Sequence, residues 1–481
     1  MYVKGLLGYL PANILQGLVG FASLTVFTRL LSPEDYGHYA MALGVTTLAQ
    51  TMFFTWIEAA MARFYPAESR DDAQAPALYG TLYRLVIAVF IGFAALSALG
   101  LWLWPGSGPF KMAVGISLGC VIFRTLVKMV QEQRKSEGRV GAASMIDMVQ
   151  TAGGFGLGAL CAWAGLGGAA PILGGGVIAL ATLPFIVRED WGRAAKGSFD
   201  RGRAKAYLQY GLPVSASLIL TLGLYTVDRF LIAHYLNAAE AGAYHAGFSL
   251  ASRILDVLFI WFGAAGGPAM VHALESGGVS GLRENARQQL RIMSFVLFPA
   301  VAGLIMVAPE LGGLLIGEGL RTEALSVTPL IAIGAVLSGL NTYYFLQAFT
   351  LAKKTKLLVI AMAVPAVSNI VLNVILIQTM GLIGAAWASL LSFALGIAAS
   401  WLLGLKTLPL PIPVLDLIKT AACAGAMMAV LSVLPRWGID VVDLAIRSVT
   451  GVVIYGALAW LLNLNSIRDI VHQRLMKRAA A

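Results

Sequence analysis

The chain has 481 residues, of which 58% are hydrophobic and only 12% charged, and its mean hydropathy is +0.79. Soluble domains are nearer one-quarter charged and contain no apolar runs of about 20 residues. Such runs recur along the whole chain. They exclude a soluble enzyme, a single membrane anchor with a large ectodomain and a nucleic-acid-binding protein. The net charge of +10 therefore indicates basic cytoplasmic loops.

The apolar runs predict an all-α polytopic membrane protein with about fourteen transmembrane helices. The helices are expected at residues 5–29, 38–62, 79–104, 110–130, 140–163, 169–187, 207–234, 242–268, 290–315, 325–350, 356–378, 382–404, 412–434 and 444–464. The even-numbered connections and the two ends hold 24 Lys and Arg residues, against 5 in the opposite connections. This asymmetry predicts that both termini are cytoplasmic.

Three sequence matches indicate an internal repeat. Residues 31–39 (LSPEDYGHY) return 205 positions later as residues 236–244 (LNAAEAGAY). In each copy an N-cap residue, Ser32 or Asn237, precedes an acidic residue by three positions. Two further matches occur in the same order: GLGGAA at 165–170 with GLIGAA at 381–386, and Arg84 with Arg291.

The repeat predicts two pseudo-symmetric six-helix lobes around a central cavity. We expect an N-lobe at residues 1–187, a basic cytoplasmic linker at 188–206 and a C-lobe at 207–404. Two additional helices and a basic cytoplasmic tail follow at 405–481. Parallel repeats of this kind place a transport pathway at the lobe interface.

Ionisable residues inside predicted spans are candidate functional groups, because each costs at least about 2.5–3.5 kcal/mol there. Arg253 and Asp256 lie one turn apart on one helix, as a ligand-binding or switching pair or as a structural intrahelical pair. Asp228 and Arg229 are adjacent and point about 100° apart. At least one of them is therefore expected to face the cavity.

Three further polar residues lie within predicted spans. Asp147 is a candidate proton site, and an interhelical contact to Arg84 or Arg124 is the alternative. Asn369 and Asn373 lie one turn apart, where they either hydrogen-bond a sugar or join two helices. The three cysteines and five histidines have no metal-ligand spacing, and no P-loop occurs. No metal or cofactor is therefore expected.

Several motifs in order resemble the polysaccharide (Wzx-like, O-antigen or exopolysaccharide) flippases of the multidrug/oligosaccharidyl-lipid/polysaccharide (MOP) exporter superfamily. They are TRLLSPEDYG at 28–37, ARFYP at 62–66, DRFL at 228–231 leading to GAY at 242–244, and Asn369 to Asn373 leading to 381–386. The resemblance covers the whole chain. It implies a flippase, not an enzyme, that moves undecaprenyl-diphosphate-linked oligosaccharide from the cytoplasmic to the periplasmic leaflet of the bacterial inner membrane. This movement, by alternating access, would serve the biosynthesis of surface polysaccharide such as lipopolysaccharide.

The resemblance also implies a cationic central cavity. That role is carried onto Arg29, Arg84, Arg229 and Arg253. A glycan polymerase and glycosyltransferases are the implied protein partners. Na⁺ or H⁺ as a coupling ion stays open.

Two other functions stay open at this point. A cation-coupled exporter of drugs or metabolites needs a membrane-embedded acid, for which Asp147, Asp228 and Asp256 qualify. The first predicted helix itself has no acid from Gly5 to Thr28. A membrane glycosyltransferase or glycan polymerase would use residues 34–35 (Glu-Asp) as an acidic pair, but helix capping explains the acid at position 35 better.

Overall fold

The computed structural model describes residues 2–69, 75–105 and 108–468, and in these ranges it contains helices and no strand. The predicted basic tail after Arg468 lies outside the described residues. The chain forms two compact units, Met1–His245 and Ala246–Ala481. The predicted all-α membrane architecture is confirmed.

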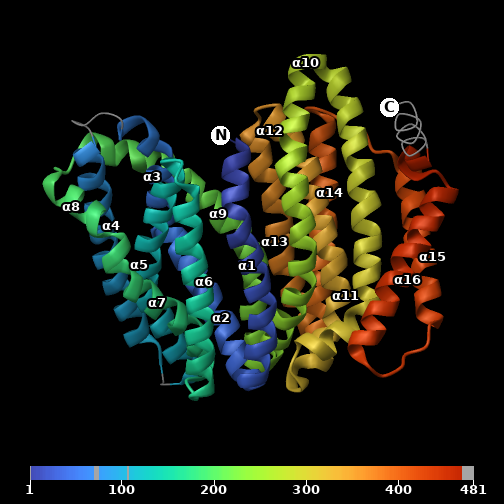
Figure 1. The fold of residues 1–481 in the computed structure, drawn as a ribbon, viewed down its shortest axis with the longest axis horizontal. Helices are drawn as coiled ribbons and strands as arrows, with labels where there is room; N and C mark the ends of the chain where they lie inside the picture. The colour runs from blue at the N-terminus through green and yellow to red at the C-terminus, as the bar shows by residue number, and fades with distance from the viewer. Residues whose placement is uncertain (1, 70–74, 106–107, 469–481) are drawn as a thin grey trace. The chain divides into compact units, whose positions relative to one another are not determined.

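The first unit contains nine helices in its described residues and the start of a tenth (Figure 1). These are α1 (Tyr2–Leu30), α2 (Pro33–Phe53), α3 (Thr55–Glu68), α4 (Ala75–Leu103), α5 (Pro109–Ser136), α6 (Val140–Trp163), α7 (Ala170–Ile186), α8 (Arg188–Lys196), α9 (Arg201–Tyr235) and the first residues of α10 (Ala238–Leu315). The span expected at 38–62 is not one straight helix, because α2 and α3 meet at a 49° bend. Phe53 and Phe54 pack on Phe93 at this break, with ring centroids 5.1 and 5.4 Å apart.

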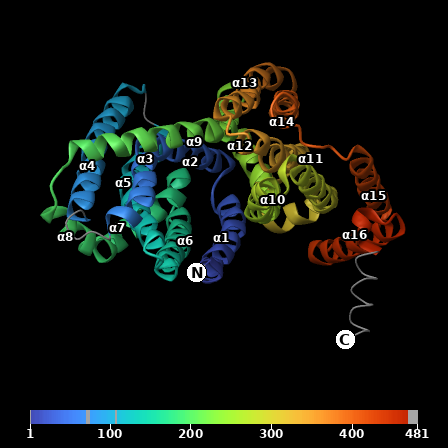
Figure 2. The same ribbon diagram turned by 90° about the horizontal axis from the view of Figure 1, so that it is seen from above.

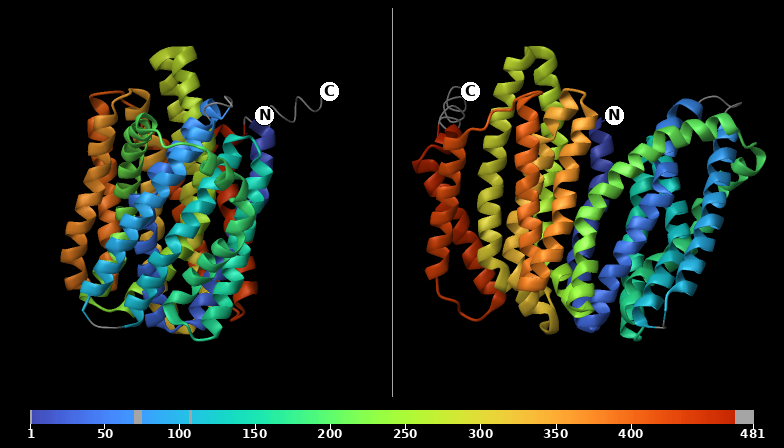
Figure 3. Two further views of the ribbon diagram at one scale, coloured as in Figure 1. Left: turned by 90° about the vertical axis from the view of Figure 1, so that its left-hand side faces the viewer. Right: turned by 180° about the vertical axis from the view of Figure 1, so that it is seen from behind.

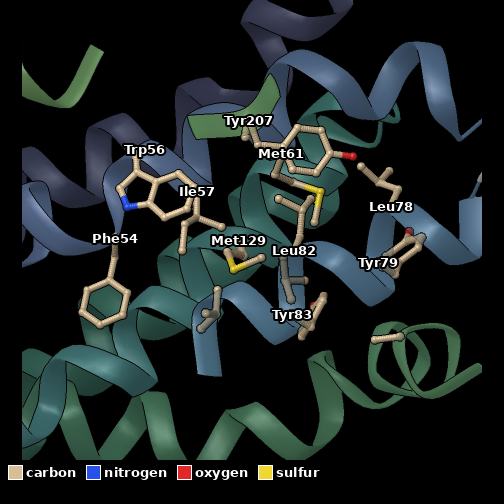
Figure 4. Close-up of a cluster of buried hydrophobic side chains, with 14 of the residues drawn as sticks. Phe54, Trp56, Ile57, Met61, Leu78, Tyr79, Leu82, Tyr83, Met129 and Tyr207 are labelled. Atoms are coloured by element: carbon tan, nitrogen blue, oxygen red, sulfur yellow. The ribbon is translucent and has the colours of Figure 1, made fainter. Parts of the chain in front are cut away.

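Buried aromatic and aliphatic side chains join α3, α4, α5 and α9 of the first unit (Figure 4). Ile57 and Met61 of α3, Leu82 of α4, Met129 of α5 and Tyr207 of α9 have no exposed surface. Because burial of each such side chain contributes about 1.5–3 kcal/mol, this cluster holds α9 against the helices that precede it.

Polar contacts also tie α9 to the first unit. Tyr207 Oη donates a hydrogen bond to Glu68 Oε2 at 2.9 Å, and Arg203 forms an ion pair with the same carboxylate. Figure 3 shows α9 as a long curved helix, and Pro213 within it is the expected cause of curvature. The compact units therefore divide after α9, at His245. The predicted lobe boundary at 188–206 follows the sequence repeat and stays a prediction; that stretch contains α8 and the start of α9.

In the second unit α10 folds back on itself as two long limbs (Figure 1), with a break at Gly278, where φ is +60° and ψ is −155°. The remaining helices are α11 (Glu318–Leu340), a π-helical turn (Asn341–Phe345), α12 (Gln347–Leu351), α13 (Thr355–Met380), α14 (Leu382–Leu405), α15 (Val414–Val433) and α16 (Asp440–Leu461). Viewed from above, α13 lies beside α14 and α15 beside α16 (Figure 2).

The predicted count of fourteen spans is not confirmed. Eleven helices of the described chain are long and apolar enough to cross a membrane, or twelve if α2 and α3 form one bent span. One of them, α10, contains two of the predicted spans. The helix α6 is not among the eleven, because Asp147, Gln150 and several glycines lower its hydropathy.

The repeated motifs have the local structure that their sequences predict. Ser32 Oγ accepts a hydrogen bond from the backbone N–H of Asp35 at 3.1 Å, and Asn237 Oδ1 accepts one from Glu240 N–H at 2.8 Å. In the second motif, Gly165 and Gly381 adopt φ angles of +85° and +62°, which favour glycine. The first match therefore shares its N-cap hydrogen bond and the second its positive-φ glycine, although Gly167 also has a positive φ of +57° and its counterpart Ile383 lies within α14.

Candidate functional site: a polar cavity in the first unit

A cavity of about 300 Å³ lies among five helices of the first unit, α1, α2, α5, α6 and α7. It is unusual in so apolar a protein because charged and amide side chains line it. They are Arg124, Lys128, Gln131, Asp147 and Gln150, together with Ser23, Tyr39 and Thr151.

The cationic part of the lining comes from α5. Arg124, Lys128 and Gln131 follow one another at intervals of four and three residues, which places them on one face of the helix. Arg124 makes no hydrogen bond and no ion pair within 4.0 Å in the described structure. An arginine inside a membrane costs at least about 2.5–3.5 kcal/mol and is normally paired. The electrostatic neighbours of Arg124 are Tyr39, which also lines the cavity, and the buried Glu58 of α3.

The opposite charge comes from α6. Asp147 Oδ2 accepts a hydrogen bond from Gln16 Nε2 of α1 at 2.5 Å. Its partner is thus neither Arg84 nor Arg124, the two contacts that the sequence suggested. On the next turn Gln150 Nε2 donates to Thr182 Oγ1 of α7 at 2.7 Å. These two hydrogen bonds fix α6 against the helices on either side.

Aromatic side chains form one wall of the cavity, and a close helix contact lies beside it. Phe27, Tyr39 and Phe155 form an aromatic wall, with Phe27 at 6.0 Å from Tyr39 and 5.9 Å from Phe155 between ring centroids. Close to it, α6 and α7 touch backbone to backbone, since a Cβ on Gly174 would lie 2.3 Å from the nitrogen of Gly158. Glycine at positions 158 and 174 thus lets the two helix backbones approach closely.

Two predicted cavity residues of the first unit do not line this cavity. Arg29 is exposed at the end of α1 and donates from Nη1 to the carbonyl of Thr25 at 2.9 Å. Arg84 is exposed on α4 and donates from Nη1 to the carbonyl of Gly197 at 2.7 Å. Arg84 therefore holds the end of α8.

Asp228 and Arg229 are both buried, at 4% and 6% exposure, and they use separate partners. Tyr244 Oη donates to Asp228 Oδ2 at 2.9 Å, and Arg229 Nε donates to His245 Nδ1 at 3.1 Å. Their contacts join the end of α9 to the start of α10.

In the second unit Arg253 and Asp256 form no ion pair, although they lie one turn apart. Asp256 is exposed, and Arg253 is half-buried. The two asparagines are buried in the packing of α13 against α14: Asn369 Nδ2 donates to Ser389 Oγ at 3.4 Å, and Asn373 Nδ2 donates to the carbonyl of Asn369 at 2.9 Å. This geometry favours their helix-joining interpretation.

The second unit has a cavity of different chemistry, of about 590 Å³, between the second limb of α10 and helices α15 and α16. Leu, Val, Ile, Phe, Met, Pro and Gly residues make up most of its wall. Its charged member, Arg447, is occupied by Glu310 at 3.3 Å and by the carbonyls of Leu431 and Leu434 at 2.9 and 2.8 Å. A lining of this kind accommodates a hydrocarbon chain.

The sequence analysis named Arg124 only as an alternative contact of Asp147, and it did not select Lys128, Gln131 or Gln150 as site residues. The signal was present as polar residues at helical spacing on two successive predicted spans. The sequence does not show which faces of α5 and α6 meet. Within the described ranges, no group of three or more His, Cys, Asp or Glu side chains is placed to hold a metal ion.

Comparisons with known proteins agree with this architecture. The family model described as "Polysaccharide biosynthesis protein" matches residues 26–321, more than half of the chain. Curated protein sequences contain no match. Among solved structures, the lipid II flippase MurJ in an inward closed conformation is similar over 96% of this chain and 99% of its own, with a TM-score of 0.76 at 15% identity.

A second solved structure has the same fold. It is a multidrug resistance transporter of the MATE family and MOP superfamily in an inward-facing conformation. It is similar over 81% of this chain and 95% of its own, with a TM-score of 0.63 at 16% identity. The family and fold expected from the motifs are thereby confirmed: this is a multi-pass membrane protein with the architecture of MOP-superfamily transport proteins.

Proposed function

Because the chain belongs to the polysaccharide biosynthesis protein family, we propose that it is a flippase for polyprenyl-diphosphate-linked oligosaccharide. It would move this lipid from the cytoplasmic to the periplasmic leaflet of the bacterial inner membrane by alternating access. The observation that carries the proposal is the pairing of chemistries in the two units. One unit encloses a charged, aromatic-lined cavity and the other an apolar one. A lipid-linked sugar has the same two parts.

The polar cavity would lower the desolvation cost of moving a sugar and its diphosphate across the membrane. Moving a hydroxyl group into hydrocarbon without a hydrogen-bond partner costs about 2–7 kcal/mol, and an ionised group costs far more. Amide, hydroxyl and guanidinium groups such as those of Gln131, Thr151 and Arg124 replace the lost water. Arginine suits phosphate because its guanidinium offers paired donors and keeps its charge.

An inside-negative membrane potential favours the export of an anion. Each elementary charge that crosses gains about 2.3 kcal/mol per 100 mV. A diphosphate therefore has a driving force without a coupling ion. Use of Na⁺ or H⁺ remains a separate prediction, as do the cavity roles of Arg29, Arg84, Arg229 and Arg253.

A cation-coupled exporter is the second candidate, since Asp147 lies in the polar cavity beside two cations. Under this alternative Asp147→Asn would abolish efflux of a substrate cation, whereas a flippase that runs on the membrane potential would retain transport. Measuring dye efflux and surface glycan in the same strain separates the two.

The decisive experiment is deletion of the gene in its host, followed by analysis of surface glycan and of the membrane pool of polyprenyl-linked sugars. We expect loss of the surface glycan together with accumulation of full-length lipid-linked oligosaccharide. A truncated oligosaccharide would instead indicate a glycosyltransferase, and an unpolymerised unit on the outer leaflet would indicate a polymerase. Unchanged glycan would contradict the proposal.

A further inference from the structure

The short helix α8 lies at a membrane face, because its nine residues connect α7 to α9, two helices that are long and apolar enough to span a membrane. It packs beside α4 (Figure 2). Asp190 and Ala194 form its buried side. A Cβ on Gly197, which follows α8, would lie 1.7 Å from the carbonyl oxygen of Pro76, and Arg84 donates to the Gly197 carbonyl. These contacts fix the side that α8 turns outward.

The two flanks of α8 lie at different depths. Because α4 begins at Ala75 and runs into the membrane, Tyr83 lies one turn deeper than Tyr79. Trp191 packs on Tyr83 with ring centroids 6.1 Å apart, and Arg193 Nη1 donates to Tyr79 Oη at 2.9 Å. The aromatic flank therefore points toward hydrocarbon and the cationic flank toward water, as in helices that lie in the membrane interface.

Exposed aromatic side chains support this placement. Trp191 is 49% exposed, Phe185 near the end of α7 is 86% exposed, and Phe199 just after α8 is 44% exposed. Aromatic belts of this kind sit at the level of the lipid headgroups. The neighbours of α8 on its open side are therefore lipids.

The outward side of α8 carries two cations. Arg188, Gly192 and Lys196 follow one another at intervals of four residues and share one side of the helix. They line a shallow hollow together with Glu189 and Arg193. In the ranges that the structure describes, neither Arg188 nor Lys196 makes a hydrogen bond or an ion pair within 4.0 Å. A Cβ on Gly192 would meet no atom within 4 Å, so the space between the two cations is open.

The acids near α8 are balanced by other bases. The three acids and three bases of this cluster are Glu137, Glu189, Asp190, Arg134, Arg139 and Arg193. Glu189 lies 3.8 Å from Arg134, and Asp190 is buried on the opposite side of α8. Asp200, at the start of α9, lies 3.6 Å from Arg203. Among the described residues, the two outward cations therefore add positive charge that these acids do not offset.

From this placement we infer that the outward side of α8 is a docking site for the headgroup of an anionic phospholipid in the adjacent leaflet. Arg188 and Lys196 contact its phosphate, and the aromatic flank with Trp191 contacts its acyl chains. Each basic residue near an anionic leaflet strengthens binding about fivefold, whereas a zwitterionic headgroup offers no net charge. This lipid is a resident neighbour and not a transported substrate, so the inference goes beyond the proposed function and does not depend on it.

The test is native mass spectrometry of the purified full-length protein, titrated with phosphatidylglycerol or with phosphatidylcholine of the same acyl chains. We expect the first phosphatidylglycerol to bind at least tenfold more tightly than the first phosphatidylcholine. Hydrogen exchange in nanodiscs of either lipid locates the site. The amides of α8 should exchange more slowly in phosphatidylglycerol.

Variants of the outward side should remove this preference. Arg188→Gln combined with Lys196→Gln should weaken phosphatidylglycerol binding at least tenfold and leave phosphatidylcholine binding unchanged. Gly192→Glu should act in the same direction, because it places an acid between the two cations at a position with room for a side chain. The matched control is Arg283→Gln combined with Lys354→Gln, which removes one exposed arginine and one exposed lysine from the second unit.

The docking site is overturned if the two lipids bind alike, if α8 exchanges alike in both nanodiscs, or if the two α8 variants keep the wild-type affinity. A loss in the control pair as large as that in the α8 pair would also overturn it, because the attraction would then come from net charge alone. Failure of the proposed function has a separate signature, since unchanged surface glycan after deletion of the gene refutes the flippase and leaves lipid docking untouched.

Discussion

Arg124 and Arg447 each line a cavity of their own unit, yet the two arginines are in opposite situations. Arg447 is 3% exposed and is held by Glu310 and two backbone carbonyls. Arg124 has none of these partners, and other polar groups share its cavity. A buried arginine that is held by a carboxylate and two backbone carbonyls belongs to the framework, whereas an arginine without a hydrogen bond or a close ion pair contributes little to it. We therefore expect loss of the Arg447 ion pair to lower the free energy of unfolding much more than substitution of Arg124.

The largest loss of stability is expected for Glu310→Ala. This change leaves Arg447 buried without its counter-charge, and breaking such a pair costs about 3–5 kcal/mol. Thermal unfolding of the purified protein in detergent measures the loss. Arg436→Ala is the control, because Arg436 contacts the same carboxylate at 3.0 Å but is 53% exposed. Equal losses of stability in both variants would show that the buried ion pair of Glu310 with Arg447 contributes no more than the exposed one with Arg436.

A smaller loss is expected for Gly174→Ala. Its Cβ would meet the backbone of Gly158 and push α7 away from α6, at a cost of about 1–3 kcal/mol. Gly175→Ala is the matched control, since its Cβ would have no atom within 4 Å even though the residue lines the polar cavity. If the adjacent glycines respond alike, the close helix contact does not support the cavity.

A third pair of variants concerns charges at the end of the first unit near α8. The carboxylate of Glu137 accepts hydrogen bonds from Tyr65 at 2.6 Å, Gln133 at 3.0 Å and Arg134 at 3.2 Å. Burial alone would raise the pKa of Glu137, but these bonds outweigh it and lower the pKa. Asp190 has no exposed surface, and burial raises its pKa above the usual range despite Gln133 and Arg134.

The two pKa shifts predict opposite responses to pH. The stabilisation from Glu137 is present above the unfolded pKa of about 4.3 and is lost as pH falls toward the lowered folded value. That from Asp190 is present below about 3.9 and is lost as pH rises through its raised folded pKa. At pH 7, Glu137→Gln should therefore cost about 1.5–3 kcal/mol, while Asp190→Asn should cost nothing or stabilise. Melting curves from pH 7 to pH 4 should show both differences shrinking; parallel curves would contradict the assignment.

The smallest effect on stability is expected for Arg124→Gln, below about 0.5 kcal/mol. The wild-type arginine makes no hydrogen bond and no ion pair within 4.0 Å in the described residues, so the free energy of unfolding should be nearly unchanged. A loss as large as that of Glu310→Ala would show that Arg124 is part of the framework. That result would remove the contrast between the two arginines.

The helices were largely predictable because each is encoded locally. The Ser32 and Asn237 caps, the left-handed Gly165 and Gly381 and the apolar runs all depend on residues within a few positions of one another. The bend at Phe54 was missed, because it arises where α2 and α3 pack on α4. The two limbs of α10 were expected as separate helices, and they are continuous apart from Gly278.

The candidate site was predictable only in part. Asp147 was singled out from its place in a membrane span, and it does line the polar cavity. Arg29 and Arg84 were selected through family resemblance, and they lie outside that cavity. The sequence allowed Asn369 and Asn373 to be sugar-binding residues. In the structure, the packing of α13 on α14 buries both side chains.

The sequence by itself determined that this chain spans a membrane, that its motifs repeat, and which polar residues lie within apolar helices. Those properties follow from the cost of burying polar groups and from local capping, which act over a few residues. Only the tertiary structure decided that Arg124 makes no hydrogen bond or ion pair within 4.0 Å in the described residues, while Arg447 is held by Glu310 and two backbone carbonyls. The difference depends on which faces of distant helices meet, because Glu310 is 137 positions from Arg447 in the sequence but only 3.3 Å away in the structure.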